Sequence, residues 1–258
     1  MKVLKLMGMA AVAALLFTSC LGEGNNSFTN SGFGVGAVSE GGSYKPVLNT
    51  AFGALYSPMA TVLPDVCYYA SFEVDLNSPE NANAATNGYY TATISGLQEV
   101  VKGSMDFYSV TDTATLVNDK EMVITNMTSG GYIDKYLFLG VAYNARKDQS
   151  NRYRLFWNQS TLDDTVTKED GISTYSLFLR VERTSDGSGS TETSTSDFQA
   201  FKIGDVLESV MKKEGNAGAD KFNLKINYLN SINEKDSTDL TWKSVKIECA
   251  TIKPNEKK

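Results

Sequence analysis

The chain has 258 residues, with 24 Lys and Arg against 30 Asp and Glu, which gives a net charge of -6. It contains 0 His, which excludes Ser-His-Asp and Cys-His catalytic arrangements and His-ligated zinc. Phosphate binding needs a basic surface that this acidic composition does not supply, so we expect no nucleic-acid partner. The hydrophobic content of 41% is that of a packed globular chain.

The first segment, residues 1–20, is predicted to be a lipoprotein signal peptide. Lys2 and Lys5 precede an uncharged apolar run over 6–17, and Thr-Ser then leads to Cys20. The run is too short to remain as a membrane-spanning anchor. The ending resembles the bacterial lipobox, which implies cleavage before Cys20 and lipid on its sulfur and amine. A plain cleaved signal with an inert Cys20 is the alternative.

Residues 21–31 are rich in Gly and Asn and are predicted to be a flexible tether. The pattern resembles lipoproteins of Bacteroidetes, many of which carry an acidic cluster after the cysteine that directs them to the cell surface. Glu23 is the only acidic residue in that window. We therefore expect the protein to contact the outer membrane through lipid on Cys20, and its periplasmic or cell-surface position stays open.

The segment 32–103 has the pattern of a small β domain. Strands are predicted at 34–39, 44–48, 67–75 and 89–99. The first two flank Glu-Gly-Gly-Ser at 40–43 and should form a hairpin. The third places Tyr68, Ala70, Phe72 and Val74 on one face. Residues 76–88 are predicted to be a loop.

The segment 119–253 has the pattern of a larger β domain. Residues 136–143 are continuously apolar and predict a central strand buried on both faces, with 152–157 as its hairpin partner. Alternating strands follow at 176–183, 221–228 and 245–249. In the first of these, Arg180 and Glu182 should point outward. Trp242 falls on the opposite parity to the apolar residues of the last strand, so either a bulge intervenes or its ring is displayed.

One helix is predicted in this domain, capped by Asp205 and ended by Gly215, with Glu208 completing a capping-box pattern. The run 184–197 consists of Ser, Thr, Gly, Asp and Glu without an apolar residue, which predicts a mobile loop. The polar stretch 102–118 is predicted to separate the two domains.

This order of elements resembles the NigD-like lipoproteins of Bacteroidetes. The resemblance rests on the lipobox, on Gly-Ala-Val-Ser at 36–39, Ser-Tyr-Lys-Pro-Val-Leu-Asn at 43–49, Phe-Gly-Ala-Leu-Tyr at 52–56 and 89–102, and on the spacing of 136–143, 173–183 and 222–228. It implies a mainly β chain, in which a small OB-like β-barrel is followed by an immunoglobulin-like β-sandwich with one short helix. It implies no particular biochemical activity.

Cys67 and Cys249 remain after lipidation. An exported protein meets an oxidising compartment, where a disulfide is permitted. The two cysteines fall in different predicted domains, so we favour two separate half-buried thiols, and their pairing stays open.

No enzymatic motif occurs in the sequence. It has no Gly-x-Ser-x-Gly elbow, phosphate loop or dinucleotide-binding glycine pattern. We therefore predict no catalytic residue, cofactor or metal, and a protein that is not an enzyme. Asp163-Asp164 and Glu169-Asp170 could hold calcium, but a solvated hairpin tip explains them better.

Two functions remain open. The first is a non-catalytic binding or interaction module of the envelope, whose sandwich edge or loops meet an unknown protein partner. The alternative is an outer-membrane glycan-binding lipoprotein in which exposed aromatic rings stack on sugars. Trp242 and Trp157 are the candidate glycan contacts, and burial of both would leave that alternative without its residues.

Three short sequences resemble the O-glycosylation signal of exported Bacteroidetes proteins. Each places an Asp directly before a hydroxyl residue, at Thr113, Thr165 and Ser237. A pattern this loose should occur about once by chance in such a chain, so these three residues are candidates only.

Overall fold

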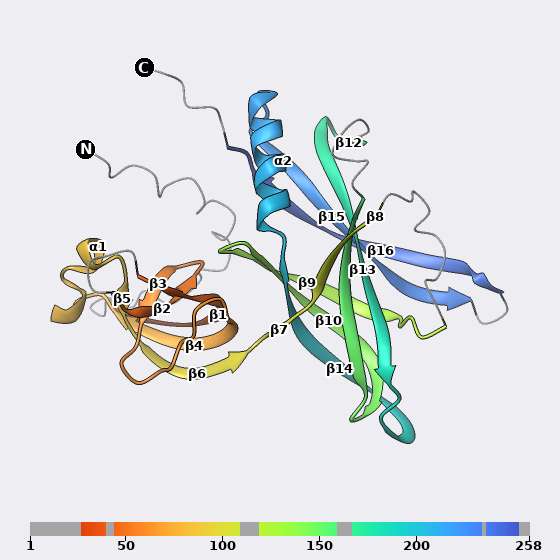
Figure 1. Ribbon diagram of the computed structural model, residues 1–258, viewed down its shortest axis with the longest axis horizontal. Helices are drawn as coiled ribbons and strands as arrows, with labels where there is room; N and C mark the ends of the chain where they lie inside the picture. Colours follow the sequence, from red (N-terminus) through yellow and green to blue (C-terminus); the bar gives the residue numbers. More distant parts are fainter. Residues whose placement is uncertain (1–26, 40–43, 109–118, 159–166, 234–235, 253–258) are drawn as a thin grey trace. The chain divides into compact units, whose positions relative to one another are not determined.

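Figure 1 shows the computed structural model of the chain. The structure describes residues 27–39, 44–108, 119–158, 167–233 and 236–252. Within them, one compact unit lies in Ala13–Val101 and Gly130–Phe138, and a larger one lies in Lys102–Ser129 and Leu139–Lys258. We call these the N-terminal and the C-terminal unit. Strands dominate both units, which confirms the mainly β prediction.

The N-terminal unit is a small closed barrel. Its strands are β1 (Ser27–Val38), β2 (Pro46–Thr50), β3 (Gly53–Tyr56), β4 (Cys67–Asp75), β5 (Tyr90–Thr91) and β6 (Thr93–Glu99). They are hydrogen-bonded in the order β5-β3-β2-β1-β4-β6. Only Ala92 lies between β5 and β6, and its N–H donates to the Tyr56 carbonyl at 2.8 Å. The two ends of the sheet are therefore one continuous segment, and the sheet closes on itself.

The barrel core follows the predicted alternation in β4. Tyr68, Ala70, Phe72 and Val74 are all buried there and pack with apolar residues of the neighbouring strands. Their partners across the barrel include Leu48 from β2 and Leu55 from β3, both 0% exposed.

Gly36 lets a connecting loop lie directly against β1. Its N–H donates to the Val66 carbonyl at 2.8 Å, and its carbonyl accepts from the Asp65 N–H at 2.7 Å. A Cβ atom at position 36 would lie 1.9 Å from the Leu63 carbonyl oxygen. Only glycine fits this close approach of two backbones.

Two sequence predictions differ from the structure in this unit. Residues 27–31, predicted as part of the tether, belong to β1 and pair with β4 from Asp75 to Ser71. Phe28 is their only apolar residue and packs against the barrel core, so the segment carries little hydrophobic signal although its backbone is part of the sheet. The predicted loop 76–88 contains a 3-10 turn, η1 (Pro79–Asn81), and one short helix, α1 (Ala84–Asn87).

The C-terminal unit is built from two sheets. Its strands are β7 (Val101–Lys102), β8 (Ser104–Tyr108), β9 (Ile124–Ile133), β10 (Tyr136–Lys147), β11 (Ser150–Asn158), β12 (Thr167–Glu169), β13 (Ile172–Ser185), β14 (Ser188–Lys202), β15 (Lys221–Asn233) and β16 (Asp236–Ala250). One sheet has the order β7-β14-β10-β9, and the other has β16-β15-β13-β11-β8 with β12 on β13. The tips of β9 and β10, 130–138, cluster with the N-terminal unit.

The two sheets bury facing side chains, as a β-sandwich does. Leu139 and Val141 of β10 and Leu177 and Leu179 of β13 are 0% exposed. Across the two sheets, the rings of Tyr143 in β10 and Tyr153 in β11 have centroids 6.4 Å apart. The predicted burial of 136–143 and the predicted inward face of 221–228 are confirmed.

The pairing of β11 differs from the prediction. β11 is not the hairpin partner of β10, because it pairs antiparallel with β13 and parallel with β8. The chain leaves one sheet at the turn containing Asp148, where φ is +59°, and enters the other. β8 itself lies in the stretch 102–118, which was predicted only to separate the domains.

The predicted mobile loop 184–197 is wrong. Its residues end β13 and begin β14, and they form a polar strand (Figure 1). Every residue from 188 to 196, which we call the polar arm, is exposed. The turn before it needs Gly187, whose φ is +72° and whose Cβ, if present, would lie 2.4 Å from the Lys147 carbonyl oxygen.

The predicted helix is confirmed as α2 (Gly204–Asn216), but its predicted ends are wrong. The N-cap is Ile203, which makes no side-chain cap hydrogen bond, and Gly215 lies buried inside the last turn. Burial of Leu207, Val210 and Met211 explains the helix better than capping does. No helix among the described residues is long and apolar enough to cross a membrane.

Candidate functional site

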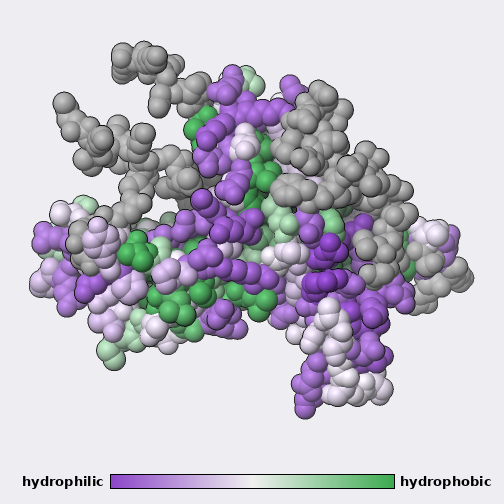
Figure 2. All heavy atoms as spheres, in the orientation of Figure 1, coloured by the Kyte–Doolittle hydropathy of each residue, from purple (hydrophilic) through white to green (hydrophobic). Residues whose placement is uncertain are grey.

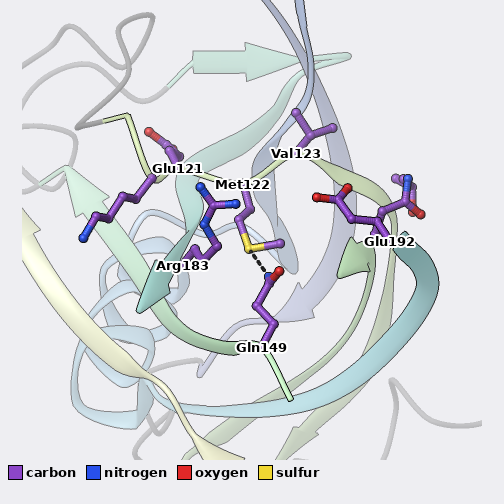
Figure 3. Close-up of a pocket in the computed structure, with 9 residues that line it drawn as sticks. Glu121, Met122, Val123, Gln149, Arg183 and Glu192 are labelled. Atoms are coloured by element: carbon purple, nitrogen blue, oxygen red, sulfur yellow. Dashed lines mark hydrogen bonds between the residues drawn. The ribbon is translucent and has the colours of Figure 1, made fainter. Parts of the chain in front are cut away.

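The C-terminal unit contains a pocket of about 220 Å³ beside the turn between β10 and β11 (Figure 3). Its wall comes from three parts of the chain. The segment 120–125 leads into β9, Gln149 belongs to the turn, and Arg183 and Glu192 lie on β13 and β14. None of these residues was predicted from the sequence, because no local motif joins three segments that only the fold brings together.

The segment before β9 is held at the edge of β13. The Met122 N–H donates to the Val181 carbonyl at 2.7 Å, and the Arg183 N–H donates to the Lys120 carbonyl at 2.9 Å. β15 pairs with β13 only as far as Tyr228. A register shift in β15 between Leu229 and Ser231 follows. Beyond that point the segment before β9, instead of β15, is hydrogen-bonded to the edge of β13.

Two nitrogen donors at the pocket have different partners. Gln149 Nε2 donates to Asn151 Oδ1 at 2.9 Å and to the Met122 sulfur at 3.2 Å (Figure 3), and the thioether is a weak acceptor. Arg183 Nε lies 2.9 Å from Asp186 Oδ1 as an ion pair, yet it makes no hydrogen bond of acceptable geometry within the described residues.

The pocket also carries two carboxylates, each opposite a guanidinium group. Glu121 Oε1 lies 2.6 Å from Arg180 Nη1, and Glu192 Oε1 lies 4.0 Å from Arg146 Nε.

Two tyrosines beside the arm share one carboxylate. Tyr143 and Tyr153 both donate to Asp197 Oδ2, the second at 2.7 Å. Burial raises the pKa of both phenols above the usual value, and the bonds to Asp197 act in the same direction. Both phenols therefore stay protonated and donating, and they tie β14 to both sheets.

Arg180 lies on the outer face of β13, as predicted, but it is not exposed there. Arg180 is 7% exposed, because the segment 120–122 and the ring of Trp242 cover that part of the outer face. Its guanidinium carbon lies 4.7 Å from the centre of the Trp242 ring. The alternation of β13 predicts the face of the sheet on which Arg180 lies. It does not predict that the segment 120–122 and the Trp242 ring cover this face.

The two tryptophans have different surroundings. Trp157 is 0% exposed in the core, 6.2 Å from the Tyr175 ring, so the predicted glycan contact at Trp157 is wrong. Trp242 is half-buried on the outer face of β16, against Arg180 and the edge of Phe178. A register shift does occur opposite it, in β15. Its contact with a glycan stays a prediction.

Several predicted residues lie outside the described part of the chain, namely Cys20, Thr113, Thr165, Asp163 and Asp164. Ser237 lies in β16, but its side chain is not described. Within the described residues no group of acidic, Cys or His side chains could hold a metal. Glu169 instead forms ion pairs with Lys225 at 3.0 Å and with Lys246.

Cys67 and Cys249 are not joined in a disulfide, in line with the separate thiols favoured from the sequence, but both are buried rather than half-buried. Cys67 lies in β4 of the N-terminal unit and Cys249 in β16 of the C-terminal unit. Burial, helped by the charge of Glu248, raises the pKa of the Cys249 thiol to about 12.

We expect the C-terminal unit to lose stability above pH 9. The folded unit keeps the Cys249 proton up to about pH 12, whereas an unfolded thiol releases it near pH 9. The unfolded state thus binds fewer protons, and stability falls by about 1.4 kcal/mol per pH unit from this group. Urea unfolding followed by tryptophan fluorescence at pH 8 and 10 measures the loss. Cys249→Ala should reduce this fall in stability between pH 8 and pH 10, and Cys67→Ala should leave it unchanged. An equal fall in both variants would contradict the assignment of the pH dependence to Cys249.

The comparisons with known proteins agree with this fold. Residues 24–98 match the model of a family described as the lipoprotein OB domain. This match confirms the predicted resemblance to lipoproteins with an OB-like first domain. A search of the curated proteins finds no match.

Solved structures extend the likeness to both units. A structure from Parabacteroides merdae has 23% identity, covers 86% of this chain and 98% of its own, and has a TM-score of 0.69. A Bacteroides fragilis structure named as a lipoprotein has 15% identity, covers 86% and 97%, and has a TM-score of 0.54. A NigD-like immunity protein from Bacteroides caccae has 13% identity, covers 86% and 97%, and has a TM-score of 0.47. The first two show a shared fold.

Proposed function

We propose that the protein is a lipid-anchored envelope protein of the outer membrane that acts as a non-catalytic binding module for another envelope protein. The anchor is supported by the lipobox ending at Cys20 and by the lipoprotein OB match that begins at residue 24. Each carboxylate of the described pocket lies against a guanidinium group, which favours binding over catalysis.

The polar arm is the observation that carries the proposal. Within the described residues, the side of β14 away from β10 pairs only with the two-residue strand β7, where the Gly103 N–H donates to the Ala200 carbonyl at 3.0 Å. The rest of that side offers backbone donors and acceptors. Natural edge strands are commonly protected by Lys or Pro, and residues 188–196 contain neither.

An extended segment of a partner can therefore add to β14 as a further strand. The arm region supplies the acidic side chains Asp186, Glu192 and Asp197 without a basic residue between 184 and 201. Charge complementarity favours a partner segment that carries Lys or Arg.

Capture from the protein's own membranes tests this function. The full mature chain should retain a specific protein, and the variant Ser190→Lys/Ser194→Lys should lose it, because lysines on an edge strand oppose pairing and repel a basic partner. Thr241→Lys/Ser244→Lys places the same charges on exposed positions of β16 and is the matched control. Capture that is equal in both variants, or no capture by the unaltered chain, contradicts the proposal.

A further inference from the structure

The pocket beside Gln149 presents one donor with a weak acceptor. The Gln149 amide gives one N–H to Asn151 Oδ1 at 2.9 Å and the other to the Met122 sulfur at 3.2 Å. Arg183 Nε lies 2.9 Å from Asp186 Oδ1 as an ion pair without a hydrogen bond of good geometry. An oxygen acceptor is a much better partner for the second Gln149 N–H than a thioether. Figure 3 shows Arg183, Met122 and Gln149 next to one another on the same side of the pocket.

Acceptors lie across from these donors. Glu192 lies on the other side of the pocket in Figure 3, and its Oε1 lies at the long distance of 4.0 Å from Arg146 Nε. Asn144 and Thr125 add an amide and a hydroxyl to the lining. A ligand that satisfies both sides must donate and accept hydrogen bonds, which is what a hydroxyl group does.

The charges of the lining oppose a charged ligand. Lys120 and Arg183 are basic, and Glu121 and Glu192 are acidic. Glu121 is paired with Arg180 and Arg183 with Asp186, so these charges are compensated within the protein and attract a charged ligand little. This balance of charges in the lining favours a neutral ligand.

Size and shape limit the ligand further. The volume of about 220 Å³ lies below the 300–1,000 Å³ or so of pockets that hold drug-sized ligands. Met122 and Val123 give the lining an apolar part, against which the C–H face of a ring can pack. One ring rather than a chain of rings suits this space.

We propose that this pocket binds a neutral polyhydroxylated molecule of about one sugar ring, with Arg183 and Gln149 as donors and Glu192 as an acceptor. The pocket shares Glu192 with the polar arm, but its other lining residues lie outside residues 188–196, and sugar binding goes beyond the protein-binding function proposed for the arm. Sugar binding is measured without a protein partner, so failure of one proposal is distinguished from failure of the other.

Binding of single sugars to the full mature chain tests the site. Calorimetry and saturation-transfer NMR with galactose, glucose and mannose should find at least one neutral hexose with a Kd of about 1 mM, as expected for a small, few-contact ligand. Arg183→Lys and Glu192→Gln should each weaken that binding about ten-fold, because each removes a hydrogen bond made by a charged group. The unfolding midpoint from tryptophan fluorescence checks that both variants fold.

Glu248→Gln is the matched control, because Glu248 is an exposed glutamate of the same unit whose ion pair is with Lys221. It should bind the sugar unchanged. Glucuronic acid and glucosamine test the charge argument, and both should bind more weakly than the neutral hexose. The proposal is overturned by the absence of binding to all three neutral hexoses, by unchanged binding in either folded variant, or by tighter binding of a charged sugar.

Discussion

Replacing Arg180 by Met is expected to lower the unfolding free energy of the C-terminal unit by about 3–5 kcal/mol. The side chains of Arg180 and Glu121 are only 9% and 3% exposed, and their charged atoms lie 2.6 Å apart. Removing the guanidinium leaves the Glu121 carboxylate buried without its counter-charge. The ring of Trp242 also loses the cation that lies 4.7 Å from its centre.

Urea unfolding followed by tryptophan fluorescence measures this cost, because Trp157 and Trp242 both lie in the C-terminal unit. Glu121→Gln should also destabilise the unit strongly. The double variant Arg180→Met/Glu121→Leu should lose less than the sum of the single changes.

Lys221→Met is the matched control for this pair. The Lys221–Glu248 pair is exposed, with side chains 46% and 56% accessible, so breaking it should cost about 1 kcal/mol or less. If Arg180→Met costs no more than Lys221→Met, the buried pair is not the stabilising feature that its geometry indicates.

Gly36→Ala is expected to destabilise the N-terminal barrel by about 3 kcal/mol. The added methyl group would lie 1.9 Å from the Leu63 carbonyl oxygen, so the loop and β1 must move apart. The hydrogen bonds that join Gly36 to Val66 and Asp65 would then lengthen or break. Overpacking and lost hydrogen bonds add in the same direction.

Amide hydrogen exchange in β1 and β4 measures this loss directly. Gly32→Ala is the matched control on the same strand, because a Cβ there meets no atom within 4 Å. The tryptophan fluorescence transition should stay unchanged in Gly36→Ala, since both tryptophans lie in the other unit. A shift of that transition as large as the loss in the barrel would contradict separate folding of the two domains.

Features with a local pattern could be predicted from the sequence. The alternation of Tyr68, Ala70, Phe72 and Val74 predicts β4, and the capping pattern of Asp205 and Glu208 with the closing Gly215 predicts α2, although not its exact ends. The start of β1 was missed because Ser27–Ser31 are paired through their backbone and carry a weak hydrophobic pattern. The sequence predicts a loop at the polar arm for the same reason, since a strand that buries no side chain leaves no periodic signal.

Features that depend on contacts between distant segments could not be predicted. The turn at Asp148 has the composition of a hairpin, yet it carries the chain from one sheet to the other. Burial of Arg180 depends on Glu121, which is 59 residues away. The pocket likewise joins 120–125, Gln149 and Glu192, and no spacing rule relates these positions.

Photo-crosslinking in cells of the native host tests the binding function of the polar arm most directly. A photoreactive residue at Thr193, which is exposed in the arm, should give a discrete crosslinked product with another envelope protein. The same residue at Ser244, which is exposed on β16, should not give that product. No product from Thr193, or the same products from both positions, would contradict a binding function of the arm.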